Sequence, residues 1–401
     1  MKIKTLILLL LFLLTFSAGA QDQSAYVRHA AAEFNKGKYS SASIICREAL
    51  SKSEDYRLYL ILADAQFALG MSIEAETYYQ KASYIAQGAG DLGLALIYAD
   101  RNDPKKLTYY LEKHLRSPFK KSESEIMLNQ HFSSFHSTDE WKNLWKRSWY
   151  TGLEKGLEEA DYLINSGRLE ELVNLQNRLV PVYRDKAAMI YLEGLVKIAT
   201  GDNKSGLEKI REALDEGYNK PDAYFSFIDA LIKDRRYAEA ANVSEQANYL
   251  FPAESEFILK LAESCRLSGD RDRAAKIAES YLDLYPASEE GLSLAGKILR
   301  EKGSYSDALK YFSKSIELYP GNADHYIDRA DVYSLTKTWQ YAISDYSMAL
   351  DLKPADADVY YRKGSALLKM GKLDDACRDF RMALKYGNNR AASDINKHCI
   401  R

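Results

Sequence analysis

The sequence contains few of the residues that most disulfide scaffolds and metal sites require. Its 401 residues include only four cysteines, eight prolines and six histidines. Four scattered cysteines are too few for a disulfide framework. The histidines form no His-Glu-x-x-His pair, and no two cysteines stand at ligand spacing, so we expect no metal site.

An excess of charge of one sign is also absent. The chain has 55 Lys and Arg residues against 57 Asp and Glu residues, a formal net charge of −2. A nucleic-acid-binding domain normally has a basic face, so we expect no nucleic-acid partner. After the first twenty residues no apolar run is long enough to span a bilayer. We therefore expect no integral membrane segment in the chain after residue 20.

Catalytic and cofactor motifs are missing or out of context. Residues 88–93 match Gly-x-Gly-x-x-Gly, but that motif binds a dinucleotide only after a strand and within a βαβ unit. Here it lies between two expected helical hairpins, which favours a simple loop. No Gly-x-Ser-x-Gly elbow occurs. We expect a protein without enzymatic activity and without a cofactor.

The first twenty residues have the build of a secretory signal peptide. Lys2 and Lys4 precede an uncharged apolar run from Thr5 to Phe16, and residues 17–20 read Ser-Ala-Gly-Ala. The alternative is an uncleaved anchor, although the run is shorter than the roughly 20 residues of a spanning helix. Cleavage before Gln21 predicts an exported protein, located in a periplasm or at the periplasmic face of an outer membrane.

What the sequence does have is a repeat. Four of its prolines are spaced 34 residues apart: Pro252, Pro286, Pro320 and Pro354. Extending this period gives seven units that begin at Leu153, Ala187, Pro221, Ser255, Glu289, Ala323 and Ala357. Position 8 of a unit is usually Ala or Gly, and so is position 20, where a second helix would cross the first closely. A recurring glycine suits the turn between the two helices, and proline cannot continue the second one. Each unit is therefore predicted to be a helical hairpin.

This pattern resembles the tetratricopeptide repeat family. The clearest unit, from Ala357 to Asn388, matches the family motif at Tyr360, Gly364, Leu367, Gly371, Ala376, Phe380 and Ala383. The next clearest, from Ala323 to Pro354, matches at Tyr326, Ala330, Tyr333, Ala342, Tyr346 and Ala349. The resemblance implies an all-α fold, a right-handed solenoid of helical hairpins, and a role in protein binding.

Five regions follow from the repeat and its interruptions. Residues 1–20 are the leader, 21–116 are looser hairpins of the same type, 117–152 are an irregular connector, 153–388 are the seven units in register, and 389–401 are a C-terminal capping helix. Solenoid ends need such caps. Cys377 and Cys399 lie in the last unit and in the cap, and both a disulfide and two free thiols are open.

The connector is rich in aromatic residues. Ser137 to Glu140 read as a capping box that opens a helix. That helix would place Trp141, Trp145 and Trp149 on one face. One interpretation is an aromatic docking face for a partner; the other is that the rings pack an irregular joint between hairpins. A connector of this kind resembles those of exported repeat proteins of Bacteroidota.

In the family, the first helix of each hairpin lines a concave groove that accepts peptides or partner helices. Position 9 of the units is often acidic, which indicates a groove for a basic or polar peptide. Arg266, Lys297 and Arg300 form a basic exception that would either receive an acidic side chain or pair with Glu263 and Glu301. The predicted partner-binding residues are Asp161, Asp229, Glu263, Arg266, Lys297, Arg300 and Asp331. The carboxylate clamp of some family members is not reproduced, since Leu157, Asp161, Leu192 and Asp222 occupy the corresponding places.

The leading hypothesis is thus a non-enzymatic scaffold of the bacterial cell envelope that binds a protein or peptide in its groove. A periplasmic chaperone or assembly factor that holds client segments is an alternative. An accessory subunit of an envelope enzyme is a third interpretation.

Overall fold

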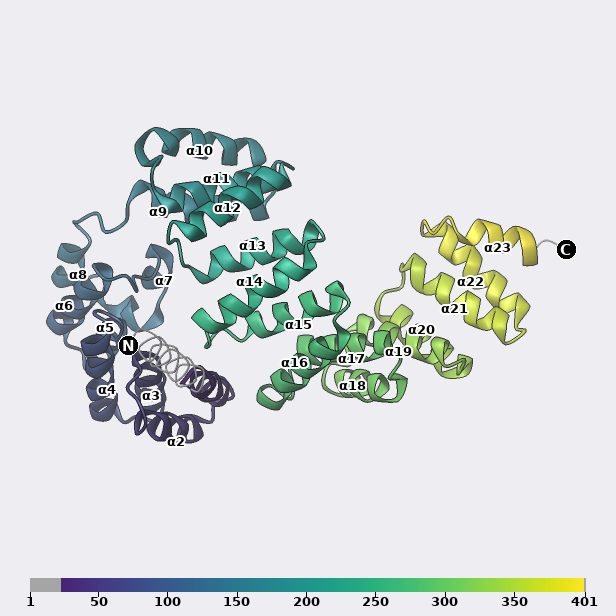
Figure 1. The fold of residues 1–401 in the computed structure, drawn as a ribbon, viewed down its shortest axis with the longest axis horizontal. Coiled ribbons are helices and arrows are strands. Elements are labelled where there is room, and N and C mark those ends of the chain that lie inside the picture. Colours follow the sequence, from purple (N-terminus) through teal and green to yellow (C-terminus); the bar gives the residue numbers. More distant parts are fainter. Residues whose placement is uncertain (1–22, 400–401) are drawn as a thin grey trace, which may run out of the picture. The chain divides into compact units, whose positions relative to one another are not determined.

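The computed structural model describes residues 23–399, and in that part of the chain the regular structure is entirely helical. The helices follow one another as antiparallel hairpins (Figure 1). The chain divides into two compact units: one holds the residues up to Arg236 together with Val243–Ser255, and the other holds Tyr237–Asn242 and the residues from Glu256 onward. The expected all-α repeat fold is confirmed.

The region 21–116 folds as three hairpins. Its helices are residues 23–35, α2 (Tyr39–Leu50), α3 (Tyr56–Ala68), α4 (Ser72–Ile85), α5 (Asp91–Asp100) and α6 (Pro104–Leu115). Pro104 is the first residue of α6, and Asp103 accepts a hydrogen bond from the backbone N–H of Lys106 at 3.0 Å. A proline at this position forgoes only a donor that the first helical turn leaves free, so Pro104 is compatible with the start of a helix.

The seven predicted units fold as seven hairpins whose first helices begin within one residue of the predicted starts. They are α9 (Gly152–Asn165) with α10 (Leu169–Tyr183), α11 (Ala187–Ala199) with α12 (Asn203–Asp215), α13 (Pro221–Lys233) with α14 (Tyr237–Leu250), α15 (Glu256–Ser268) with α16 (Arg271–Leu284), α17 (Glu289–Lys302) with α18 (Tyr305–Leu318), α19 (Ala323–Leu335) with α20 (Trp339–Leu352), and α21 (Ala357–Lys369) with α22 (Leu373–Lys385).

Small residues at positions 8 and 20 let the two helices of a hairpin approach closely. A Cβ on Gly206 would lie 2.9 Å from the carbonyl oxygen of Gly194 on the facing helix. A Cβ on Gly296 would lie 2.4 Å from the ring of Phe312. Both distances are too short for a carbon contact, so side chains larger than hydrogen would push the helices apart.

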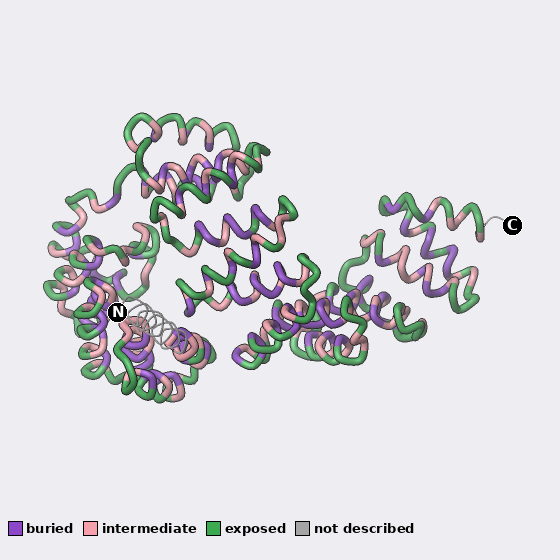
Figure 2. The backbone as a smooth tube through the Cα atoms, in the orientation of Figure 1, coloured by how far each residue is buried: buried purple, intermediate pink, exposed green. Residues whose placement is uncertain are grey.

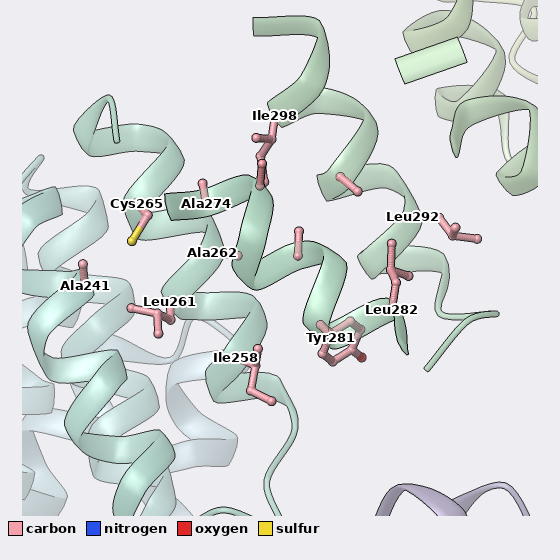
Figure 3. Packing of buried hydrophobic residues seen from close by; sticks show 13 residues of the cluster. Ala241, Ile258, Leu261, Ala262, Cys265, Ala274, Tyr281, Leu282, Leu292 and Ile298 are labelled. Carbon is pink, nitrogen blue, oxygen red and sulfur yellow. The ribbon is translucent and has the colours of Figure 1, made fainter. Parts of the chain in front are cut away.

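Each hairpin buries one stripe of every helix and exposes the other. Figure 2 shows this alternation of buried and exposed turns along the helices. In the second of the two compact units, Ala262 and Ala274 lie in a core with Leu261, Tyr281 and Ile298 (Figure 3). Ala262, Ala274 and Ile298 are fully buried. The small residues thus mark the helix crossings and the large ones fill the space around them.

The connector differs from its prediction. It contains α7 (Glu123–Met127), a 3-10 helix η1 (Gln130–Phe135) and α8 (Asp139–Leu144). The N-cap of α8 is Thr138, which accepts from the backbone N–H of Trp141 at 3.3 Å, and not Ser137. The helix ends at Leu144, so the prediction of one helix carrying three tryptophans is wrong. The indole N–H of Trp149 donates to the carbonyl of Leu144 at 2.9 Å, which closes the helix end and turns the chain back.

A short helix, α23 (Ala391–His398), follows the last hairpin, and Ala391 is fully buried against it. A disulfide joins Cys377 on α22 to Cys399 just after α23, which decides between the two alternatives for these thiols. The predicted leader, residues 1–20, lies outside the described residues. Between residues 23 and 399, no helix has the length and apolar composition needed to cross a bilayer.

Candidate functional site

The first helices of successive hairpins contact one another within each compact unit. Helix α11 lies beside α9 and α13, and α17 lies beside α15 and α19. Their outward residues therefore form a shared surface, which we call the first-helix face of that unit. All seven predicted partner-binding residues lie on these helices.

On the first-helix face of the second compact unit, the basic residues Arg266, Lys297 and Arg300 are paired with carboxylates. The Arg266 guanidinium binds Glu263 on its own helix at 2.7 Å and also pairs with Glu301 on α17. Hydrogen bonding to Glu263 raises the pKa of Arg266 further above its usual range. Arg266 therefore pairs with Glu263 and Glu301 of its own chain, which is one of the two alternatives that the sequence left open.

Arg300 and Lys297 on α17 also pair with carboxylates of the neighbouring hairpin. Arg300 lies 3.0 Å from Asp328 and 3.5 Å from Asp331, both on α19, and Lys297 lies 3.5 Å from Asp328. Asp331 also pairs with Arg362 on α21 at 2.9 Å. Ion pairs therefore connect α15, α17, α19 and α21 in series.

Asp328 and Arg362 were missed by the sequence reasoning. Each lies at position 6 of its unit, one helical turn before position 9. The signal that could have found them is the complementary charge at position 6 of one unit and positions 9 and 12 of the unit before it.

Two acids on first helices have a structural role inside their own hairpin. The hydroxyl of Tyr346 donates to Asp331 at 2.7 Å, and that of Tyr79 donates to Asp64 at 2.5 Å. Both pairs are 15 residues apart. One unit before Tyr346 the same position is Phe312, which has no hydroxyl, and the position of Asp331 is taken by Lys297. In these two hairpins an acid on the first helix thus accompanies a tyrosine 15 residues later.

On the first-helix face of the first compact unit, by contrast, carboxylates lie together without basic partners among the described residues. Asp161 on α9 is exposed, and its pKa is raised by partial desolvation and by the negative charges of Asp222 and Glu158. Asp222 on α13 and Glu158 are exposed as well. Within residues 23–399, no lysine or arginine forms a salt bridge with Asp161 or Asp222. These three carboxylates therefore repel one another without a compensating cation.

Two tyrosines lie beside these carboxylates. The rings of Tyr191 and Tyr218 stack with their centroids 5.0 Å apart. The Tyr191 hydroxyl lies 3.0 Å from that of Ser226, so its orientation is fixed. Burial, together with the charges of Asp222 and Asp161, raises the pKa of Tyr218 to about 12. We refer to Glu158, Asp161, Asp222, Tyr191 and Tyr218 as the acidic face. Asp229, also predicted, is exposed further along α13.

The three connector tryptophans do not share a free surface. Trp141 is 3% exposed and packs on Phe132, with the ring centroids 5.8 Å apart. Trp145 and Trp149 are half-buried and pack against the same core. Trp141 therefore belongs to the joint between hairpins, and only Trp145 and Trp149 retain exposed area.

Residues with other chemistry are not gathered into a further site. In the described part of the chain, no group of three His, Cys, Asp or Glu side chains is placed to hold a metal ion. The glycine-rich residues 88–93 form the turn between α4 and α5 and the start of α5. Gly88 has φ +89°, as expected of a tight turn. This segment joins two hairpins, as the loop interpretation predicted.

Comparison with known proteins agrees with this architecture. A family model described as "Tetratricopeptide repeat" matches residues 259–323 and 293–357. A second model with the same description matches residues 56–88 and 357–386. No curated protein matches the chain.

Among solved structures, the hetero-tetramer Cut9–Hcn1 of the APC/C is similar at 15% identity and a TM-score of 0.46, over 97% of this chain and 98% of that one. A tetratricopeptide repeat protein from Parabacteroides merdae ATCC 43184 is similar at 17% identity and a TM-score of 0.48, over 60% of this chain and 95% of that one. A structure of MamA covers 41% of this chain and 96% of its own, at 22% identity and a TM-score of 0.37.

Proposed function

We propose that this chain, which carries tetratricopeptide repeats, is a non-enzymatic scaffold that binds a basic segment of a partner protein on the acidic face of α9, α11 and α13. The observation that carries this proposal is the contrast between the two first-helix faces. In the second unit the charged side chains pair with one another. In the first unit Asp161 and Asp222 raise each other's electrostatic energy.

A lysine or arginine from a partner would relieve this repulsion. Each carboxylate gains a hydrogen-bonded cation, and charge-assisted hydrogen bonds are stronger than neutral ones. Tyr191 is buried, but the half-buried ring of Tyr218 offers a cation a second kind of contact, through the negative potential of the ring face. Complementary charge of this type favours specificity and fast association.

The proposed location is the bacterial cell envelope. Two features support it: the leader-like residues 1–20 in the sequence, and the Cys377–Cys399 disulfide. Disulfides persist in oxidising compartments such as the periplasm and are rare in the cytosol. Detection of the protein in a periplasmic extract, with the disulfide intact, would test this part of the proposal.

The test of the acidic face uses a fluorescein-labelled octalysine peptide and the full chain, with binding followed by fluorescence anisotropy. We expect Asp161→Asn with Asp222→Asn to weaken binding about tenfold, equivalent to about 1.4 kcal/mol. Asp324→Asn is the matched control because Asp324 is also an exposed acid on a first helix, but pairs with Lys353 at 2.8 Å. The affinity of the Asp324→Asn variant for octalysine should stay within about twofold of that of the unmodified chain, because exposed ion pairs contribute little. Equal affinity of both variants would remove the acidic face as the binding site.

A photo-crosslinking residue in place of Tyr162 would then identify the natural partner. Tyr162 is 61% exposed and adjacent to Asp161, so the substitution leaves the core intact. A scaffold should keep one stoichiometric partner through gel filtration. A holding chaperone should instead capture many unfolded proteins and suppress their aggregation.

A further inference from the structure

A second surface of the first unit has the opposite character from the acidic face. It is centred on Trp149, in the segment that follows α8. The indole N–H of Trp149 is used in closing α8, and its carbonyl oxygen accepts from Lys120 at 3.0 Å. The ring is thus held in one orientation while remaining half-exposed.

Two arginines flank this ring. The guanidinium of Arg116, at the end of α6, lies 5.6 Å from the Trp149 ring centroid, and that of Arg147 lies 5.9 Å from it. Both guanidinium groups bind the same oxygen of Glu112 at 2.6 Å. The side chains of Arg116 and Arg147 are nevertheless 62% and 60% exposed. One carboxylate thus holds two arginines in place and leaves most of their donors to solvent.

Two hollows adjoin Arg116, Trp149 and Arg147. The first has a volume of about 300 Å³, and Trp149, Arg147, Lys146 and Lys155 contribute to its wall. The second has a volume of about 210 Å³ and is lined by Arg116, Lys113 and Asp91 among others. Both are large enough for an amino-acid side chain, and an arginine that contacts Trp149 lines each of them.

The charge balance of this surface is positive. Its cations are Lys113, Arg116, Lys146, Arg147 and Lys155, and the carboxylates among them are Asp91, Glu112 and Glu123. Asp91 is only 1% exposed and lies 3.4 Å from Lys113, and Glu123 lies 2.6 Å from Lys155. Lys146 has no carboxylate partner within residues 23–399. A ligand therefore meets five cations and an aromatic ring. Of the three carboxylates, Asp91 is buried, whereas Glu112 and Glu123 are 35% and 33% exposed and are each engaged by a cation.

We propose that this Trp149 surface, made of Trp149, Arg116, Arg147 and the two adjoining hollows, binds an acidic extended segment of a partner protein. Aspartate or glutamate side chains accept from the free donors of the two arginines, whose planar forks match a carboxylate. The methylene groups of the segment lie on the Trp149 ring, and neighbouring side chains enter the hollows. The chain then has two binding surfaces of opposite charge preference, one for a basic segment and one for an acidic segment.

The experiment uses a fluorescein-labelled octaglutamate peptide with the full chain, measured by anisotropy, and octalysine as the comparison probe. We expect Arg116→Gln with Arg147→Gln to weaken octaglutamate binding about tenfold, since two charge-assisted contacts are lost. Octalysine binding should not weaken. Arg178→Gln is the matched control because Arg178 is an equally exposed arginine, 65% exposed, that pairs with Glu159 on α9 and lines neither hollow. Its affinity for octaglutamate should remain within about twofold.

A charge-preserving variant separates geometry from net charge. Arg116→Lys with Arg147→Lys keeps both positive charges but loses the planar forks, so we expect a loss of about threefold. If octaglutamate does not bind the unmodified chain, or binds the Gln and Arg178 variants alike, the proposal is overturned. It is also overturned if vesicles containing phosphatidylglycerol bind in an arginine-dependent way while octaglutamate does not, because the site then recognises a membrane surface. Loss of octalysine binding by Asp161→Asn with Asp222→Asn leaves this test unaffected, so the two proposals can fail separately.

Discussion

The desolvated carboxylate of Asp64, a residue of intermediate exposure, has an energetic cost that its hydrogen bond does not remove. Burial raises the pKa of Asp64 to about 6, although the hydrogen bond from Tyr79 acts to lower it. The raised pKa means that the folded state holds the proton more tightly than the unfolded chain does. Ionised Asp64 therefore destabilises the fold.

Replacing Asp64 with asparagine should stabilise the protein at neutral pH. The unfolded carboxyl titrates near 3.8 and the folded one near 6, so stability falls as pH rises through this interval and the full cost is present above it. Asp64→Asn removes the charge and keeps an acceptor for Tyr79, with a gain of at most about 3 kcal/mol. Chemical denaturation at pH 4 and pH 7.5 measures it. The gain should be small at pH 4 and largest at pH 7.5.

Asp331 is the matched control, because it accepts from the corresponding tyrosine of its own hairpin, Tyr346, but has two arginine partners as well. Arg362 lies 2.9 Å and Arg300 lies 3.5 Å from its carboxylate. Asp331→Asn should therefore destabilise the protein, by about 1 kcal/mol for half-exposed ion pairs. Stabilisation by both substitutions would show that the arginines do not compensate the buried charge.

At the scale of single elements, α23 depends on its covalent link. The helix has eight residues, which is too short to be stable in isolation. The Cys377–Cys399 disulfide closes a segment with a sequence separation of 22, and Ile395 and Cys399 pack on the core of the last hairpin. The hydroxyl of Tyr361 on α21 also donates to Asp394 of α23 at 3.0 Å. The cap is thus held by a small apolar contact, a hydrogen bond and one covalent bond.

Removal of this bond should loosen the cap before it affects other helices. We expect Cys377→Ser with Cys399→Ser to lower the stability of the last hairpin by about 3 kcal/mol, from the loop-closure entropy of a segment of this length. Hydrogen exchange should rise first in α23. Dithiothreitol should produce the same change in the unmodified chain and none in the double variant. A similar response of both proteins would assign the effect to another target of the reductant.

Local sequence signals mark where the seven hairpins begin because the turns depend on local chemistry. Gly303 ends α17 with φ +81°, and Ser288 caps its start by accepting from the backbone N–H of Gly291. The connector could not be predicted in the same way. The end of α8 is closed by the indole of Trp149, a contact that helical periodicity does not encode. The pairing of Arg266 with Glu301 was foreseen only as one of two alternatives, since it depends on the spacing between neighbouring hairpins.

At the scale of the whole molecule, the seven hairpins in register share one pattern and differ in the charges that the pattern leaves free. Positions 8 and 20 are constrained by the helix crossing, so they are predictable from sequence. Position 9 is not constrained in this way. Asp331 is held by Tyr346 and by arginines, whereas Asp161 has the carboxylates of Asp222 and Glu158 as neighbours. The sequence therefore predicted an acidic groove over both compact units. In the described residues, the position 9 acids Glu263 and Asp331 of the second compact unit are paired with arginines, whereas Asp161 of the first forms no salt bridge.

A solenoid of this kind should respond locally to a large core deletion, because each hairpin packs only on its neighbours. Phe312 is fully buried in α18 against Gly296 of α17 and Val332 of α19. Phe312→Ala should cost about 3–5 kcal/mol. We expect faster hydrogen exchange in α17, α18 and α19, and unchanged exchange in α11 and α12.

Leu207→Ala gives the reciprocal experiment, since Leu207 on α12 is also fully buried. It should cost about 2–5 kcal/mol and increase exchange in α11, α12 and α13. Helices α17 to α19 should then stay protected. If either substitution raises exchange evenly along the whole chain, the two compact units unfold as one cooperative structure. The nearest-neighbour description would then be wrong. If the responses are local, ligand binding at the acidic face should protect α9 to α13 and leave α17 to α19 as they were, because stabilisation is transmitted through the same contacts as destabilisation.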